Sequence, residues 1–210
     1  SLHDALPISF AAALQPGRTM LAIAETPSNP LLELVDLDEF GGLRGPITLV
    51  DSTFATPLGQ QPLAHGVHLS LHSATKGIAG HNDATLGVVS GERDLLNEIW
   101  GYHVLHGAVP SPFDALNALR GIRTLGVRTT HQAASALHLA QQLQDHPAVA
   151  AVHYPGLLDH PQHALATLEA KASETQAQVD LFAAPPESAA ALPSPVEAAL
   201  AAIDPDARSE

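Results

Sequence analysis

Short apolar runs alternate with longer amphipathic segments over most of this 210-residue chain. Runs of four or five apolar residues that stop at prolines, acids or glycines are typical of buried strands, whereas longer segments of helical period are typical of helices. We expect strands at residues 20–24, 47–50, 67–71 and 85–89, and helices at 36–43, 92–105, 112–120 and 127–144. This alternation predicts an α/β fold in which helices flank a mostly parallel sheet.

The character of the sequence changes near both ends. Residues 1–9 show no pattern and resemble translated adapter sequence from DNA sequencing, so we expect them to be unstructured and without function. Residues 164–210 are rich in alanine and acids and contain five prolines, which predicts a flexible tail. The expected folded domain therefore covers residues 10–163.

Composition narrows the possible partners and compartments. The net charge of -13, with nine Lys and Arg residues, argues against binding to nucleic acid, which requires a basic face. No apolar run reaches the roughly 18 residues of a membrane span, and no signal peptide is visible. Because the chain also lacks cysteine, we expect a cytoplasmic protein without disulfides or thiolate metal sites.

The main candidate for chemistry is Lys76, the only lysine in the first 170 residues. It lies among small residues in Ser73–Gly77, directly after an expected strand. A lysine that is held still and partly desolvated can form a Schiff base with an aldehyde or ketone, although many such lysines are simply exposed loop residues. Asn29 and Asp51 also follow expected strands, and ligands of parallel sheets bind beyond the carboxyl ends of the strands. The three side chains could therefore converge on one site.

A pyridoxal cofactor needs a lysine for its aldehyde, a carboxylate beside its pyridine nitrogen and donors for its phosphate. Asp51 could be that carboxylate, Ser73 and Thr75 could bind the phosphate, and Asn29 could contact the ring hydroxyl or a substrate carboxylate. Each feature alone has an ordinary explanation, since a strand-end Asp often caps a helix and an Asn between prolines is usually a turn residue.

Several motifs occur in a characteristic order: Glu25–Leu32, Val50–Pro57, His72–Lys76, His81–Asp83, Gly107–Asp114, Leu119–Leu125 and His153–Leu157. Together they resemble the Cys/Met-metabolism family of pyridoxal 5'-phosphate (PLP) enzymes, which includes cystathionine γ-synthase, cystathionine γ-lyase and methionine γ-lyase. The resemblance implies part of the large domain of a fold-type-I PLP-dependent transferase. It also implies a site in which Lys76 binds PLP and moves protons, Asp51 pairs with the pyridine nitrogen, and the other cofactor contacts are Asn29, Thr53, Ser73 and Thr75.

The implied function is that of a PLP-dependent lyase or transferase of trans-sulfuration and methionine metabolism. Such an enzyme acts by elimination or replacement on sulfur-containing or γ-substituted amino acids and assembles as a dimer of dimers. The family's glycine-rich phosphate-binding turn has no counterpart before Phe10, and nothing after His163 resembles its carboxyl-terminal domain. The chain therefore looks like a central fragment, and the alternative is a non-catalytic remnant. Synthase and lyase activities stay open.

The tail has a different resemblance. Segments Gln178–Ala183 and Val196–Asp206 are similar to the extreme carboxyl terminus of the bacterial DNA mismatch-repair ATPase. They contain no ATPase motif, so no repair activity is implied. A join near His163 to Ala166 would make the chain a chimera.

The 13 histidines suggest metal binding, but their spacing does not support it. Two groups are close in sequence, namely His65, His68 and His72, and His103 with His106. Neither group has a carboxylate or cysteine at ligand spacing, and no HExxH motif occurs, so we expect no metal site. Three arginines near expected helix ends are expected to cap helices or to pair with acids: Arg120, Arg123 and Arg128.

Overall fold

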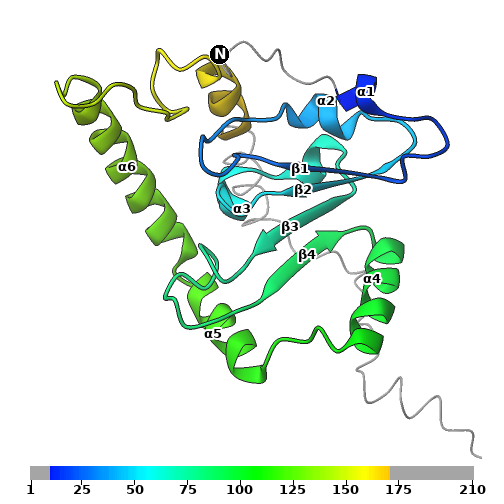
Figure 1. Ribbon diagram of the computed structural model, residues 1–210. Coiled ribbons are helices and arrows are strands. Elements are labelled where there is room, and N and C mark those ends of the chain that lie inside the picture. Colours follow the sequence, from blue (N-terminus) through cyan, green and yellow to red (C-terminus); the bar gives the residue numbers. More distant parts are fainter. Residues whose placement is uncertain (1–9, 171–210) are drawn as a thin grey trace, which may run out of the picture. The chain divides into compact units, whose positions relative to one another are not determined.

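The computed structural model of the protein describes residues 10–170 (Figure 1). Expectations for residues 1–9 and 171–210, including the second resemblance of the tail, lie outside this range. Four strands form one sheet in the order β1 (Leu21–Glu25), β2 (Ile47–Asp51), β3 (Leu69–Ser73) and β4 (Gly87–Gly91). The pairs β1–β2 and β2–β3 are parallel and β3–β4 is antiparallel. The prediction of a mostly parallel sheet is confirmed.

Seven helices are assigned along the described chain, and a further short helical stretch follows them. They are α1 (Phe10–Ala13), α2 (Leu37–Gly41), α3 (Thr56–Gly59), the 3-10 helix η2 (Pro62–His65), α4 (Arg93–His106), α5 (Pro112–Ile122) and α6 (Leu125–Gln144), and residues 163–170 are also helical. All eight elements expected from the hydrophobic pattern are present, with ends within two residues of the expected ones. The three short helices α1, α3 and η2 have too few residues to show a periodicity.

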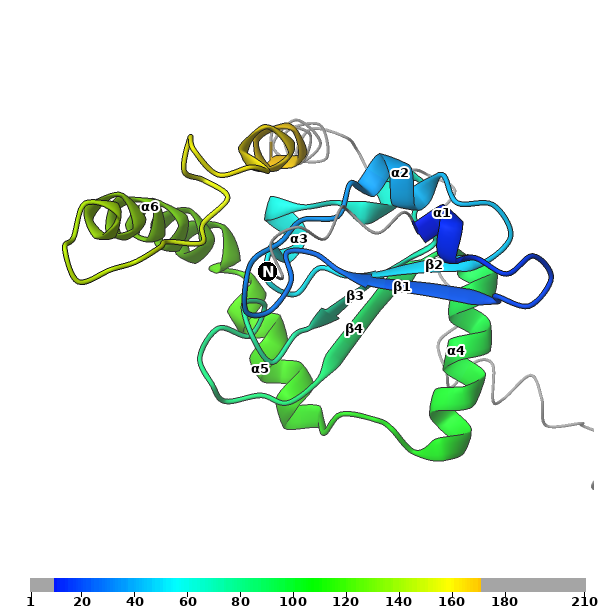
Figure 2. The same cartoon turned by 45° about the horizontal axis from the view of Figure 1, so that its top comes forward.

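One face of the sheet forms the main core with α2. Ala24 and Val50 are paired in register and therefore lie on the same face, where they pack with Leu37, Phe40 and Val67. Figures 1 and 2 show α1 and α2 on the same side of the sheet. A second cluster of small residues, Ala79, Ala84 and Ala118, joins the turn after β3 to α5.

The beginning of α5 is bound to the segment that precedes β4. The Ser111 hydroxyl accepts a hydrogen bond from the amide of Asp114 (3.1 Å) and donates one to the Asp114 carboxylate (2.7 Å). The same carboxylate accepts a hydrogen bond from the amide of Thr85 (2.9 Å). This capping arrangement satisfies amides at the helix start, and these hydrogen bonds hold the pKa of Asp114 below its usual value.

The compact part of the chain extends past residue 163. Gln162 binds the backbone of Leu34 through two hydrogen bonds (2.8 and 2.6 Å), and buried Glu169 accepts a hydrogen bond from Gln60. Residues 164–170, which the composition places in the tail, are thus an ordered helix. Within residues 10–170 no helix combines the length and apolar character needed to cross a membrane.

Candidate cofactor site

The carboxyl ends of the three parallel strands meet at one edge of the sheet. The amide of Thr26, after β1, donates to the carbonyl of Asp51 (3.1 Å), and the amide of Ser52 donates to the carbonyl of Leu71 in β3 (3.0 Å). Parallel pairing therefore places the segments that follow β1, β2 and β3 side by side. These are the segments in which the sequence places its candidate site residues.

Asp51, Thr53 and Ser73 form a hydrogen-bonded chain at this edge. Oδ1 of Asp51 accepts hydrogen bonds from the amide (3.0 Å) and the hydroxyl (2.6 Å) of Thr53. The Thr53 hydroxyl in turn accepts the amide of Ser73 (2.7 Å). Oδ2 of Asp51 accepts no hydrogen bond from any residue between 10 and 170, so the carboxylate is oriented but keeps one oxygen for a ligand.

Lys76 lies in a compact turn directly after β3. Its amide donates to the carbonyl of Ser73 (3.0 Å), and its carbonyl accepts the amide of Gly80 (2.8 Å). The Lys76 side chain is exposed. The ion pair found within residues 10–170 joins His65 to Asp38 and does not involve Lys76. The Lys76 amine is therefore bound to no carboxylate of residues 10–170.

The two hydroxyls that flank Lys76 differ in their surroundings. Oγ of Ser73 makes no hydrogen bond within the described range, whereas Oγ1 of Thr75 accepts the amide of Leu86 (3.0 Å) and donates to its carbonyl (3.3 Å). A hydroxyl has one proton to donate, so the Thr75 proton must turn away from the Leu86 carbonyl to bind a phosphate. The Leu86 carbonyl would still accept the Thr75 amide (3.2 Å), and Oγ1 could still accept the Leu86 amide.

Asn29 is less closely attached to the site. It is exposed in the loop after β1, which is shaped by the side chains of its neighbours: the Ser28 hydroxyl accepts the amide of Glu33 (3.1 Å) and the Thr26 hydroxyl accepts that of Val35 (3.1 Å). No hydrogen bond joins the Asn29 side chain to another residue of the described chain. The structure brings Asp51, Thr53, Ser73 and the Lys76 turn together, and it leaves the contacts of Asn29 as a prediction.

Sequence patterns did not single out His72 as a neighbour of this site. It lies between Leu71 and Ser73 in β3 but points to the opposite face of the sheet, with 6% of its surface exposed. Its Nε2 has no hydrogen-bond partner among the described residues. Burial lowers the pKa of His72, and the nearby charge of Asp51 opposes this effect. The burial of the ring therefore disfavours its protonated form.

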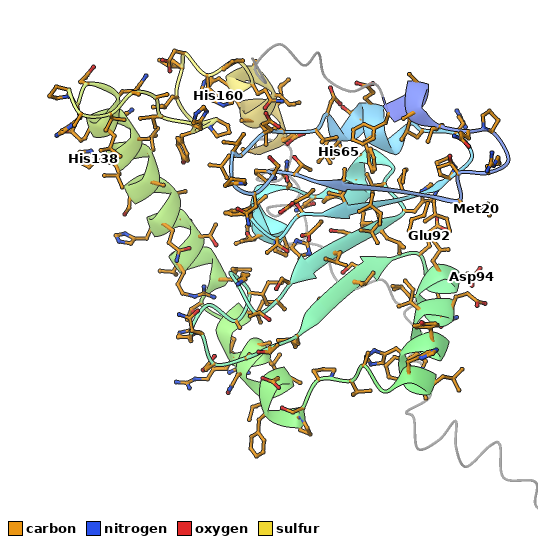
Figure 3. All side chains as sticks on the ribbon, in the orientation of Figure 1. Met20, His65, Glu92, Asp94, His138 and His160 are labelled. Atoms are coloured by element: carbon orange, nitrogen blue, oxygen red, sulfur yellow. The ribbon has the colours of Figure 1, made fainter. Side chains whose placement is uncertain are left out.

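The histidines do not gather into a metal centre in the described structure. His65, His138 and His160 lie apart, on η2, on α6 and on the loop after α6 (Figure 3). His68 uses its ring to bind the hydroxyl of Thr48 (2.8 Å). Between residues 10 and 170 no group of three or more His, Cys, Asp or Glu residues is placed to hold a metal ion.

Arg128 is a second neighbour of the site, although the sequence patterns indicated only a helix cap or a partner of an acid for it. From the first turn of α6 its guanidinium donates to the carbonyls of Gly77 (2.8 Å) and Ile78 (3.2 Å), which directly follow Lys76. It also donates to the carbonyl of Gly121 in the last turn of α5 (2.9 Å), which confirms that this arginine caps a helix. It forms no ion pair with an acid of the described range.

Comparison with known proteins identifies the class that this fold and site define. The pattern of the family described as "Cys/Met metabolism PLP-dependent enzyme" matches residues 3–182. The chain belongs to this family. The match includes the whole candidate site, and it extends beyond both ends of the expected domain of residues 10–163.

Two named relatives show where the similarity lies. Cystathionine gamma-synthase 1, chloroplastic, of Nicotiana tabacum is 42% identical over 157 residues, which are 73% of this chain and 29% of that protein. L-methionine gamma-lyase of Brevibacterium sandarakinum is 46% identical over 149 residues, or 70% of this chain and 38% of that protein. The chain thus spans well under half the length of these curated relatives.

Solved structures agree with the fold. The cystathione gamma lyase CalE6 from Micromonospora echinospora matches 76% of this chain and 43% of its own, with 44% identity and a TM-score of 0.71. The metB protein from Corynebacterium glutamicum matches 76% of this chain and 42% of its own, with 38% identity and a TM-score of 0.73. The expected class, a part of the large domain of a fold-type-I PLP enzyme, is confirmed.

Proposed function

We propose that this chain carries the PLP-binding centre of a trans-sulfuration enzyme of the cystathionine γ-synthase or lyase type. The enzyme would act by elimination or replacement on sulfur-containing or γ-substituted amino acids. The observation that carries the proposal is the arrangement at one edge of three parallel strands. There an oriented Asp51 carboxylate with a free oxygen is hydrogen-bonded, through Thr53, to the backbone of the strand that presents Lys76.

The residues present fit the cofactor. Oδ2 of Asp51 is available to accept a hydrogen bond from a protonated pyridine nitrogen, and the Ser73 hydroxyl is available to donate to a phosphate. Lys76 can bind the aldehyde because no carboxylate of the described chain competes for its amine. When bound, PLP accepts electrons from the substrate carbon beside the amino group. Thr75 would supply a further phosphate contact, and Asn29 would reach the cofactor or the substrate.

Each residue then has a definite task. The negative charge of Asp51 would keep a bound ring nitrogen protonated, and Thr53 fixes the carboxylate by donating two hydrogen bonds to its other oxygen. The Lys76 amine would act as a general base that removes a proton from one substrate carbon and returns it to another.

A spectroscopic titration tests the proposal. Purified protein mixed with PLP should develop the yellow absorption of a lysine-bound cofactor, and borohydride should fix the cofactor on the peptide that contains Lys76. Lys76→Ala should abolish both signals, because no other residue can form the bond at this edge. The matched control is Lys171→Ala, which removes the only other lysine of the chain and should leave both signals intact. Absorption that survives Lys76→Ala would sink the assignment.

The second candidate is a non-catalytic fragment of the same family. Exposed apolar side chains favour it: Ile23 on the outer strand β1 is 60% exposed, and Trp100 and Leu105 on α4 are 61% and 84% exposed. Open strand edges and apolar patches of this kind favour association or aggregation. An absence of lysine-bound PLP in the wild-type chain would support this candidate, whereas turnover of cystathionine by the isolated chain would exclude it.

We further propose a homo-oligomer, a dimer of dimers, in the cytoplasm. The absence of cysteine suits a reducing compartment, and the exposed apolar residues of α4 suit burial against other chains. Light scattering on a size-exclusion column measures the assembly, and a monodisperse monomer would contradict it.

The proposed origin of the tail as a piece of the DNA mismatch-repair ATPase rests on the sequence of residues 178–206. The family match reaches residue 182 and thus overlaps its beginning. Amplification of source DNA across codons 163–166 tests the join, and one continuous genomic product would count against a chimera.

A further inference from the structure

Arg128 binds two backbone carbonyls of the Lys76 turn that have no hydrogen-bond donor within the turn itself. Within this turn the carbonyls of Ser73, Ala74 and Lys76 accept amides of the turn (3.0, 2.8 and 2.8 Å), and the carbonyl of Ala79 accepts the ring nitrogen of His81 (2.6 Å). The two carbonyls between those of Lys76 and Ala79 belong to Gly77 and Ile78, and both are bound by the guanidinium of Arg128.

The guanidinium is itself held by two fixed points. Nε donates to the hydroxyl of Thr124 (3.1 Å), and Nη2 donates to the carbonyl of Gly121 as well as to that of Ile78. Four of its five N–H groups are thus accounted for by acceptors in α5, in the α5–α6 junction and in the Lys76 turn. Such a planar fork has a fixed geometry that the flexible ammonium of a lysine cannot reproduce.

Two glycines make this approach possible. A Cβ on Gly80, whose φ is +72°, would lie 2.0 Å from Nη1 of Arg128, and a Cβ on Gly121 would lie 2.1 Å from the carbonyl oxygen of Ala79. Any other residue at either position would push α5 or the guanidinium away from the turn. The sequence thus provides the space that Arg128 occupies.

We propose that Arg128 is a positioning residue for the cofactor-bearing lysine. It fixes the backbone directly after Lys76, so that the amine is presented at the strand edge beside Asp51 and Ser73. This inference rests on the proposed function, since it assigns Arg128 a task in that same site. A misplacement of about 1 Å at a reacting group can lower a rate by about a hundredfold, which is why the hold on this turn matters.

The experiment compares Arg128→Met, Arg128→Lys and Arg123→Met with the wild-type chain. Arg123 is a matched control, because it is exposed, lies at the end of α5 and makes no hydrogen bond through its side chain to a described residue. Two quantities are measured: the PLP concentration that half-saturates the absorption of lysine-bound cofactor, and amide hydrogen exchange of the peptide containing residues 76–80. Circular dichroism first establishes that each variant is folded.

We expect Arg128→Met to raise the half-saturating PLP concentration about tenfold or more and to speed exchange of the Lys76 turn, with β2 unchanged. Arg128→Lys should recover part of the loss, because one ammonium can bind one of the two carbonyls, and Arg123→Met should match the wild type. Unchanged PLP binding in Arg128→Met overturns the positioning role, even if exchange accelerates, because Arg128 then only stabilises the turn. If Arg128→Met does not fold, Arg128→Lys decides by the same two measurements. Absence of lysine-bound PLP in the wild type overturns the proposed function itself, and with it any cofactor to position.

Discussion

Two helices that follow β4 differ sharply in how they use their apolar residues. In α5 the small residues Ala118 and Gly121 are buried against the turn after Lys76, and the helix is bound at both ends by Asp114 and Arg128. In α4 no residue is buried, and its rings of Trp100 and Tyr102 stack on histidines of the same helix. Close packing therefore surrounds the candidate site, while α4 gains little from the rest of the described chain.

The largest difference between the candidate site and α4 should appear when Asp51→Asn is tested for PLP affinity. An asparagine keeps the shape but loses the charge that binds a protonated ring nitrogen, and a charge-assisted hydrogen bond contributes about 1.5–3 kcal/mol. PLP affinity should fall about 10- to 100-fold, measured by absorbance titration. Asp94→Asn in the first turn of α4 is the control and should leave the affinity unchanged. Equal losses in both variants would remove the distinction between the regions.

A pair of glycine substitutions sharpens the comparison further. Gly121→Ala in α5 would place a methyl group 2.1 Å from the Ala79 carbonyl oxygen and should lower the free energy of unfolding by about 1–3 kcal/mol. Gly101→Ala in α4 meets nothing within 4 Å and should raise it by up to about 1 kcal/mol, because alanine favours helix over glycine. Urea denaturation measures both. Changes of the same sign would contradict the picture of a packed α5 and an open α4.

The smallest effect is a pH dependence. Burial lowers the folded-state pKa of His72 below its usual value of 6.5, so the unfolded chain binds a proton more readily than the folded one. The contribution of neutral His72 to stability is therefore intact above about pH 6.5 and is lost as the pH falls below that value. In urea denaturation at a series of pH values, His72→Gln should flatten the loss of stability on acidification.

Buried Glu169 should have the opposite effect on the pH dependence of stability. Burial raises the pKa of Glu169 above its usual value of 4.5, so this residue stabilises the folded chain at low pH and loses that effect as the pH rises through the raised pKa. Glu169→Gln should therefore steepen the loss on acidification, in contrast to His72→Gln. Slopes that change in the same direction in both variants would contradict the assignment of these two buried groups.

The hydrophobic pattern predicted the elements well because each strand and long helix repeats its own local signal. Strand ends also placed Asp51 and Lys76 correctly, since parallel pairing brings carboxyl ends to one edge. The surroundings of Thr75 were not predictable in this way. Its hydroxyl binds Leu86, 11 residues further along the chain, and nothing in the motif around Lys76 specifies that contact.

By itself, the sequence determined the class of fold and the family, and it predicted which residues could bind an aldehyde, a ring nitrogen and a phosphate. These depend on residue types and short spacings. Only the tertiary structure decided which of these residues are fixed by hydrogen bonds, and which other residues supply those bonds. Arg128 reaches carbonyls 51 and 50 residues earlier in the chain, and two glycines leave the space for it. Such contacts form when α5 and α6 pack against the turn. A local pattern of hydrophobic and polar residues cannot predict a contact between residues that are 50 positions apart.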